Sequence, residues 1–158
     1  MRKQLLDPTA LGMALPLREA WLDLEEIAQV QVTSEHPDYP IESAFRFGCG
    51  PGWRASGPGK QTIRLIFDHP QQLRRIWLRF LEAGTERTQE FSLRWSSDKE
   101  SRKQEIVRQQ WNFSPEGSTT EIEDYRVNLE NVSLLELTIT PDLSRGNAVA
   151  TLADWSIA

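Results

Sequence analysis

The stretch Gln61-Thr62-Ile63-Arg64-Leu65-Ile66-Phe67-Asp68 decides the fold, because its apolar side chains recur at every second position. Successive side chains of a β-strand point to opposite faces, so Ile63, Leu65 and Phe67 would face a core while Arg64 and Ile66 lie on the outer face. The same period of two returns at residues 76–80, 91–95 and 135–139. This repeated alternation predicts β-strands and excludes a mainly helical protein.

Turn-forming residues separate the alternating segments, as at Asp68-His69-Pro70 and Pro115-Glu116-Gly117. Almost no helical stretch lies between the segments, which disfavours a parallel sheet with crossover helices. We therefore expect an all-β protein, an antiparallel β-sandwich of the jelly-roll type with about eight strands. The predicted strands cover residues 27–34, 61–68, 73–81, 89–96, 104–113, 119–129, 132–140 and 148–157.

Residues 1–26 differ in composition from the rest of the chain. Pro16 could open a short helix in which Leu17, Trp21, Leu24 and Ala28 share one face. We expect residues 1–26 to form a short N-terminal extension packed on a sandwich domain of residues 27–158. A chain of 158 residues is long enough to build one core.

The composition limits the function classes. The formal net charge is −5, so no basic surface for nucleic acid is expected. No apolar run is long enough to cross a bilayer. The N-terminal residues lack the pattern of a secretory signal, and one cysteine cannot form an internal disulfide. These features predict a cytoplasmic location.

A series of short motifs resembles a known family. The series consists of Val32-Thr33-Ser34-Glu35, Gly52-Trp53-Arg54-Ala55-Ser56, Phe91-Ser92-Leu93-Arg94-Trp95-Ser96-Ser97-Asp98 and Ala150-Thr151-Leu152-Ala153-Asp154-Trp155-Ser156-Ile157. In this order the motifs resemble the discoidin, or coagulation-factor C-type, domains of the galactose-binding-like superfamily. The resemblance covers residues 27–157. It implies an eight-stranded jelly roll that binds glycans, lipid head groups, collagen or other proteins through loops at one end.

Two departures from that family bear on function. Its members usually carry an Asp-Gly pair before the loop tryptophan, whereas residues 43–48 here contain no acid. A calcium site, known in some relatives and dependent on oxygen ligands, is therefore doubtful. The disulfide that usually joins the ends of extracellular members cannot form with one cysteine.

Catalytic patterns are weak. Gly59-Lys60 lacks both the preceding glycine and the following Ser or Thr of a phosphate loop. Cys49 and His36 share one loop region, yet a small residue in a turn explains Cys49 better than a nucleophile does. Glu121 and Glu123 would share one strand face, which we interpret as solvated. The sequence predicts no enzyme, no cofactor and no metal.

The predicted ligand site lies in the region of residues 34–60, which is rich in Pro and Gly, and in the turn of residues 82–88. Long irregular loops in compact domains are often functional. Sugar sites combine an aromatic face with a few directed polar groups. The residues chosen are His36, Tyr39, Trp53, Arg54 and Arg87, a combination that the resemblance also associates with galactose-type sites. Trp53 has two possible roles, as a core residue or as a platform for the ligand, and the core role is favoured.

Trp77 is out of phase with Ile76 and Leu78, so we expect it on an outer sheet face beside Arg79. Either residues 1–26 cover it, or it belongs to an exposed apolar patch that marks a partner. The sequence thus supports two hypotheses. The first is a non-catalytic module that binds carbohydrate through its loops. The second is an intracellular protein-interaction or assembly subunit that uses Trp77 and Arg79. Its partner could be another copy of the same chain, which would make it a homo-oligomer.

Overall fold

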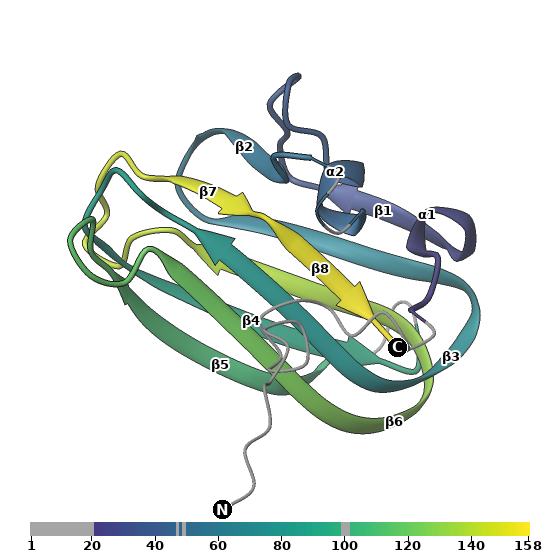
Figure 1. Ribbon diagram of the computed structural model, residues 1–158. Helices are drawn as coiled ribbons and strands as arrows, with labels where there is room; N and C mark the ends of the chain where they lie inside the picture. The colour runs from purple at the N-terminus through teal and green to yellow at the C-terminus, as the bar shows by residue number, and fades with distance from the viewer. Residues whose placement is uncertain (1–20, 47, 49, 99–101) are drawn as a thin grey trace, which may run out of the picture.

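The computed structural model describes residues 21–46, 48, 50–98 and 102–158 (Figure 1). Every strand pair in this part of the chain is antiparallel, and each of its two helices is a single turn. The predicted all-β class is confirmed. The elements are α1 (Leu24–Ile27), β1 (Ala28–Val32), α2 (Glu42–Phe45), β2 (Trp53–Pro58), β3 (Gln61–Leu81), β4 (Arg87–Ser96), β5 (Gln104–Phe113), β6 (Thr120–Thr140), β7 (Val149–Leu152) and β8 (Asp154–Ile157).

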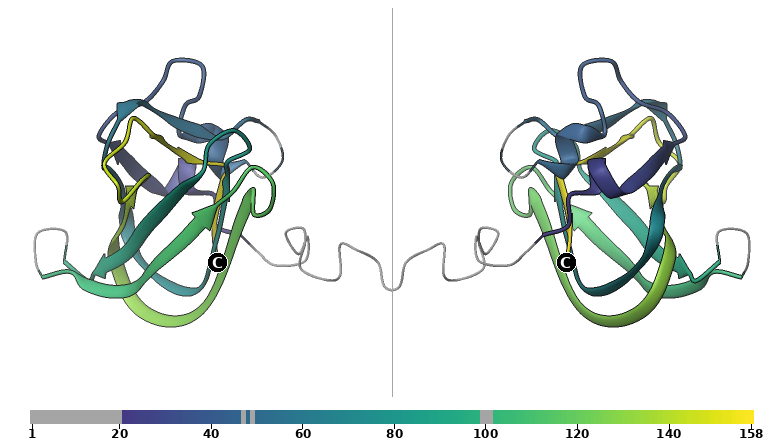
Figure 2. Two further views of the ribbon diagram at one scale, coloured as in Figure 1. Left: turned by 90° about the vertical axis from the view of Figure 1, so that its left-hand side faces the viewer. Right: turned by 90° about the vertical axis from the view of Figure 1, so that its right-hand side faces the viewer.

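Two long strands build both layers of the sandwich. β3 and β6 each span 21 residues and pair along most of their length, with register shifts between Ile66 and Arg75. These shifts accompany a bend that folds the paired strands over on themselves (Figure 2). One layer has the order β1, first half of β3, second half of β6, β4, β5. The other contains β8, the second half of β3 and the first half of β6.

β2 and β7 form a separate two-stranded sheet, and β7 leads through Ala153 directly into β8. This small sheet lies next to the loop that follows β1 (Figure 1). The segment of residues 148–157, predicted as one strand, is thus two strands that belong to different sheets. The strand β2 was missed because Pro58 and two nearby glycines in residues 53–59 give it the composition of a loop.

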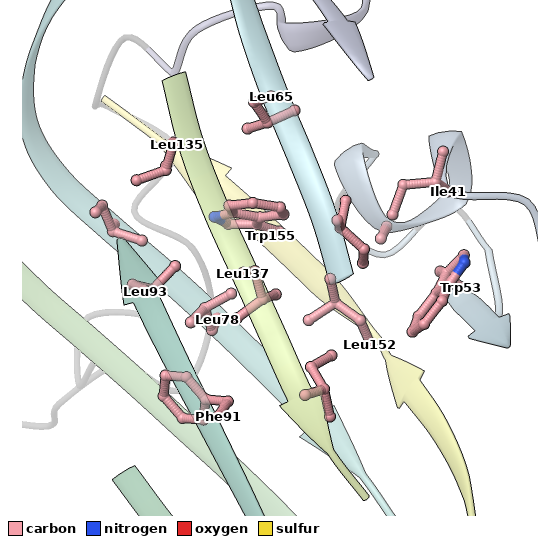
Figure 3. Close-up of a cluster of buried hydrophobic side chains, with 14 of the residues drawn as sticks. Ile41, Trp53, Leu65, Leu78, Phe91, Leu93, Leu135, Leu137, Leu152 and Trp155 are labelled. Atoms are coloured by element: carbon pink, nitrogen blue, oxygen red, sulfur yellow. The ribbon is translucent and has the colours of Figure 1, made fainter. Parts of the chain in front are cut away.

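The core confirms the alternation that predicted the strands. Ile63, Leu65 and Phe67 of β3 are fully buried between the layers. They pack in one cluster with side chains from the other strands and from both helical turns (Figure 3). Other members of this cluster are Leu24, Ala44, Leu78, Phe80, Phe91, Leu93, Leu135, Leu137, Ile139 and Trp155.

Asp68-His69-Pro70 does not interrupt β3, so the turn predicted there is wrong. The ladder to β6 has partners at Ile66 and at Gln71 but none between them. Pro70 lies in this gap, where the ladder needs no N–H donor. A strand tolerates proline at such a position. β6 is likewise continuous where the sequence predicted two strands. At its bend, between those two predicted strands, Asn131 adopts a positive φ of 56°.

The expected N-terminal helix lies mainly outside the described residues. Within them, Leu22 donates its backbone N–H to the carbonyl of Ile157 at 2.8 Å, and Leu24 is buried in the core. Ala28, expected on the helix, is instead the first residue of β1. Among the residues described, no helix has the length and hydropathy of a membrane span.

Candidate loop site

The loop after β1 is tied to β2 by backbone hydrogen bonds. His36 and Tyr39 form an isolated antiparallel bridge around the Pro37-Asp38 turn. The N–H of His36 donates to the carbonyl of Arg54 at 2.8 Å, and the N–H of Arg54 donates to the carbonyl of Tyr39 at 3.2 Å. Three predicted site residues are therefore brought together by the backbone itself.

The side chains of these residues also contact one another. The imidazole of His36 meets the ring of Tyr39 edge-on, with centroids 5.1 Å apart and planes at 68°. The N–H of Asp38 donates to Nδ1 of His36 at 3.1 Å, so a neutral His36 ring carries its proton on Nε2. The Cζ atom of Arg54 lies 4.8 Å from the centre of the Tyr39 ring, a cation–π distance.

A small depression of about 130 Å³ opens beside this cluster, where β2, β7 and the end of β3 meet. Leu81, one of the two most exposed large apolar side chains in the described chain, forms part of its wall at 44% exposure. We call the group His36, Tyr39, Arg54 and Leu81 the loop site. The depression is lined by Tyr39, Pro51, Trp53, Arg54, Leu81, Thr151 and Ala153.

Trp53 belongs to the core, with only 1% of its surface exposed. Its indole Nε1–H donates to the carbonyl of Ser34 at 3.2 Å. The preceding Gly52 has a φ of +81°, and a Cβ added there would lie 2.4 Å from the carbonyl oxygen of Leu152. Glycine is needed for this close approach. Trp53 therefore supports the floor of the depression and presents no open face to a ligand.

Arg87 does not lie in the turn where the sequence placed it. It is the first residue of β4, is 3% exposed, and has its guanidinium 4.7 Å from the Phe113 ring centre. Its Nε–H donates to Glu82 at 2.8 Å and its Nη1–H to the carbonyl of Pro141 at 2.7 Å. No described contact joins it to His36, Tyr39 or Arg54. Arg87 also lines a second, wider depression of about 670 Å³ that includes Leu143.

A buried polar chain continues from Arg87 into the sandwich. Arg87 donates to Gln89 at 3.1 Å, and Gln89 donates to Glu121 at 3.2 Å. Burial, together with the neighbouring carboxyl of Glu123, raises the pKa of Glu121 to about 8. The interpretation of Glu121 and Glu123 as a solvated face was wrong for Glu121, which is fully buried. Strand alternation alone could not show which face of β6 is covered.

The two residues predicted to bind a partner, Trp77 and Arg79, lie in the layer that contains β8. Trp77 is 1% exposed, so it forms no exposed apolar patch. The Nε–H of Arg79 donates to the buried Asp154 at 2.6 Å. Burial raises the pKa of Asp154 even though Arg79 opposes the shift. The second hypothesis therefore lacks the exposed tryptophan on which it depended.

Cys49 lies outside the described residues. Within the described residues, no group of three or more His, Cys, Asp or Glu side chains is arranged to hold a metal ion.

Comparisons with known proteins find the fold but no sequence family. No protein-family model matches the chain, and no curated protein sequence matches it. Solved structures do match. The family 32 carbohydrate-binding module (CBM32) of AlyQ, in complex with 4,5-unsaturated mannuronic acid, has a TM-score of 0.63 and 19% identity over 89% of this chain and 98% of that one.

Two other solved structures give the same result. The family 32 module of NanJ from C. perfringens, in complex with galactose, has a TM-score of 0.62 and 11% identity over 87% of this chain and 96% of that one. A pectin-binding module has a TM-score of 0.56 and 17% identity over 84% and 90%. At these identities the likeness establishes the fold. The predicted antiparallel β-sandwich is confirmed, and it has the fold of these modules.

Proposed function

We propose that this chain is a non-catalytic carbohydrate-binding module whose ligand is held at the loop site. The observation that carries the proposal is that Tyr39 and Arg54 line one small depression, with His36 packed against Tyr39 beside it. A sugar ring has an apolar face and a polar rim, so its site needs an aromatic or aliphatic surface and a few donors. Tyr39 and Leu81 supply the surface, while Arg54 and Nε2 of His36 supply donors.

The structural neighbours support the same class of ligand. Modules with this fold have been solved with a mannuronic acid derivative and with galactose, and another is named for pectin binding. The non-catalytic role is supported by the position of the acid pair. Glycoside hydrolysis needs two carboxyl groups that flank an open sugar site. Glu121 instead lies buried inside the sandwich, hydrogen-bonded to Gln89.

A sugar titration followed by NMR or calorimetry tests this function. The panel should contain neutral and acidic monosaccharides and short oligosaccharides. The chain has two histidines, which provides a matched pair of variants. We expect His36→Ala to weaken binding because His36 packs against Tyr39, whereas His69→Ala, at an exposed position on β3 with no described contact to Tyr39 or Arg54, should leave binding unchanged.

Two results would contradict the proposal. One is the absence of binding to every sugar in the panel at millimolar concentration. The other is binding that both histidine variants weaken equally, because such binding would not depend on the loop site.

A further inference from the structure

Three arginine side chains lie over aromatic rings in the described part of the chain, and two of them already hold a carboxylate. Arg75 lies 5.2 Å from the Trp21 ring centre, and its Nε and Nη2 donate to the two oxygens of Asp124 at 2.8 and 2.7 Å. Arg87 lies over Phe113 and donates to Glu82 at 2.8 Å. In both cases the ring covers one face of the guanidinium while an edge of the group binds an acid.

Arg54 stacks on an aromatic ring but binds no carboxylate among the described residues. Its guanidinium lies over Tyr39, yet among the described residues it has no hydrogen bond or ion pair to any side chain. The residue is exposed and lines the depression of the loop site. Arg94, an exposed arginine without a described carboxylate partner, has no described aromatic ring beneath it. Of the three stacked arginines, Arg54 is therefore the one whose guanidinium has no described hydrogen-bond acceptor.

This arrangement prepares Arg54 for an external carboxylate. The backbone of Arg54 is hydrogen-bonded to both His36 and Tyr39, so the base of the side chain is fixed. Stacking restricts the planar group further and leaves its N–H edge open. A guanidinium edge matches the two oxygens of a carboxylate and forms paired charge-assisted hydrogen bonds, which neutral hydroxyls cannot reproduce.

We propose that the ligand of the loop site is an acidic sugar whose carboxylate binds the guanidinium of Arg54. This inference rests on the proposed function and narrows its ligand class. Tyr39 and Leu81 would contact the sugar ring while Arg54 takes the acid group. The chemistry fits a hexuronic acid or a sialic acid, both of which carry a carboxylate on a pyranose ring.

The test compares each acid with its own neutral form. The probes are the methyl glycosides of galacturonic, glucuronic and sialic acid, the methyl ester of each of these glycosides, methyl galactoside, and acetate. Binding to the full chain is followed by NMR or calorimetry. We expect at least one free acid to bind about tenfold or more tightly than the neutral sugars, as hydrogen bonds to charged groups predict. The acid that binds best identifies the sugar class.

Three variants locate the effect. Arg54→Gln should abolish the difference between acid and ester, and Arg54→Lys should retain only part of it because an ammonium group cannot bind both oxygens in one plane. Arg94→Gln, which removes an exposed arginine on β4, should keep the full difference.

Each remaining outcome is decisive. Equal binding of acid and ester, or a preference that survives Arg54→Gln, overturns the acidic-sugar inference while leaving the proposed function intact. Acetate that binds as tightly as the acidic glycosides would show that no sugar is recognised. A complete lack of binding by acidic and neutral sugars would instead overturn the proposed function itself.

Discussion

The guanidinium of Arg54 stacks on the ring of Tyr39, with 4.8 Å between Cζ and the ring centre, although a stretch rich in Pro and Gly separates the two residues in sequence. The N–H of Arg54 also donates to the carbonyl of Tyr39. The loop after β1 and the strand β2 are thus held together by a backbone hydrogen bond and by side-chain stacking. A site arranged before the ligand arrives loses less conformational entropy on binding.

Replacing Tyr39 separates the roles of its ring and its hydroxyl. Tyr39→Ala removes both the apolar surface and the support of Arg54, so sugar affinity should fall by about fivefold or more. Tyr39→Phe keeps the ring and should bind nearly as well as the parent chain. Calorimetry on the three proteins checks this. Equal affinity of the alanine variant and the parent would show that the ring does not contact the ligand.

Arg87 should behave as a structural residue. Arg87→Ala leaves Glu82 without its partner and the Pro141 carbonyl without its donor, so we expect the free energy of unfolding to fall by about 3 kcal/mol. Arg54→Ala, at an exposed position, should change stability little and binding strongly. Urea denaturation of both variants makes the comparison. A stable Arg87→Ala protein that has lost only sugar binding would restore Arg87 to the ligand site.

Glu121 makes stability depend on pH. Its pKa is raised in the folded protein, so its contribution to stability is full below about pH 4.5 and is lost as the pH rises toward 8. Glu121→Gln cannot ionise and should therefore raise the melting temperature at pH 9 relative to the parent, with a smaller effect at pH 5. Glu116→Gln, in an exposed turn, is the control. Parallel melting profiles of parent and Glu121→Gln across this range would refute the assignment.

Gly52 should tolerate no side chain. An alanine Cβ would lie 2.4 Å from the Leu152 carbonyl oxygen and 2.7 Å from the Cα of Ala153, in a backbone conformation with positive φ. We expect Gly52→Ala to cost about 2 kcal/mol of stability or more. Gly57→Ala, where nothing lies within 4 Å of the added Cβ, should be nearly neutral. If the two variants unfold at the same denaturant concentration, the close contact at Gly52 is not maintained in solution.

The sandwich was predictable because burial on one face leaves a period of two in the sequence. Ile63, Leu65 and Phe67 follow that period and are all buried. The continuity of β3 was not predictable, since Asp68-His69-Pro70 has the chemistry of a turn and the bend arises from a gap in pairing with β6. β2 escaped detection because its pairing with β7 depends on residues distant in sequence.

The loop site was predictable in part. The Pro/Gly-rich region pointed to His36, Tyr39 and Arg54, and the structure brings these three together. Arg87 and Trp53 have side chains as suitable for sugar binding as the other three, but tertiary packing buries both. Leu81 was missed because one exposed leucine at the end of a strand has no distinguishing pattern. Only the adjacency of β3 to β7 makes it part of a site.

The most direct measurement is a map of backbone amide chemical shifts during titration of the isotope-labelled chain with the sugar that binds best. The proposed function predicts that the largest changes cluster at His36, Tyr39, Arg54 and Leu81, and that they disappear in Tyr39→Ala. Saturable changes centred on the outer face of β4 and β5, or spread evenly over the molecule, would contradict it.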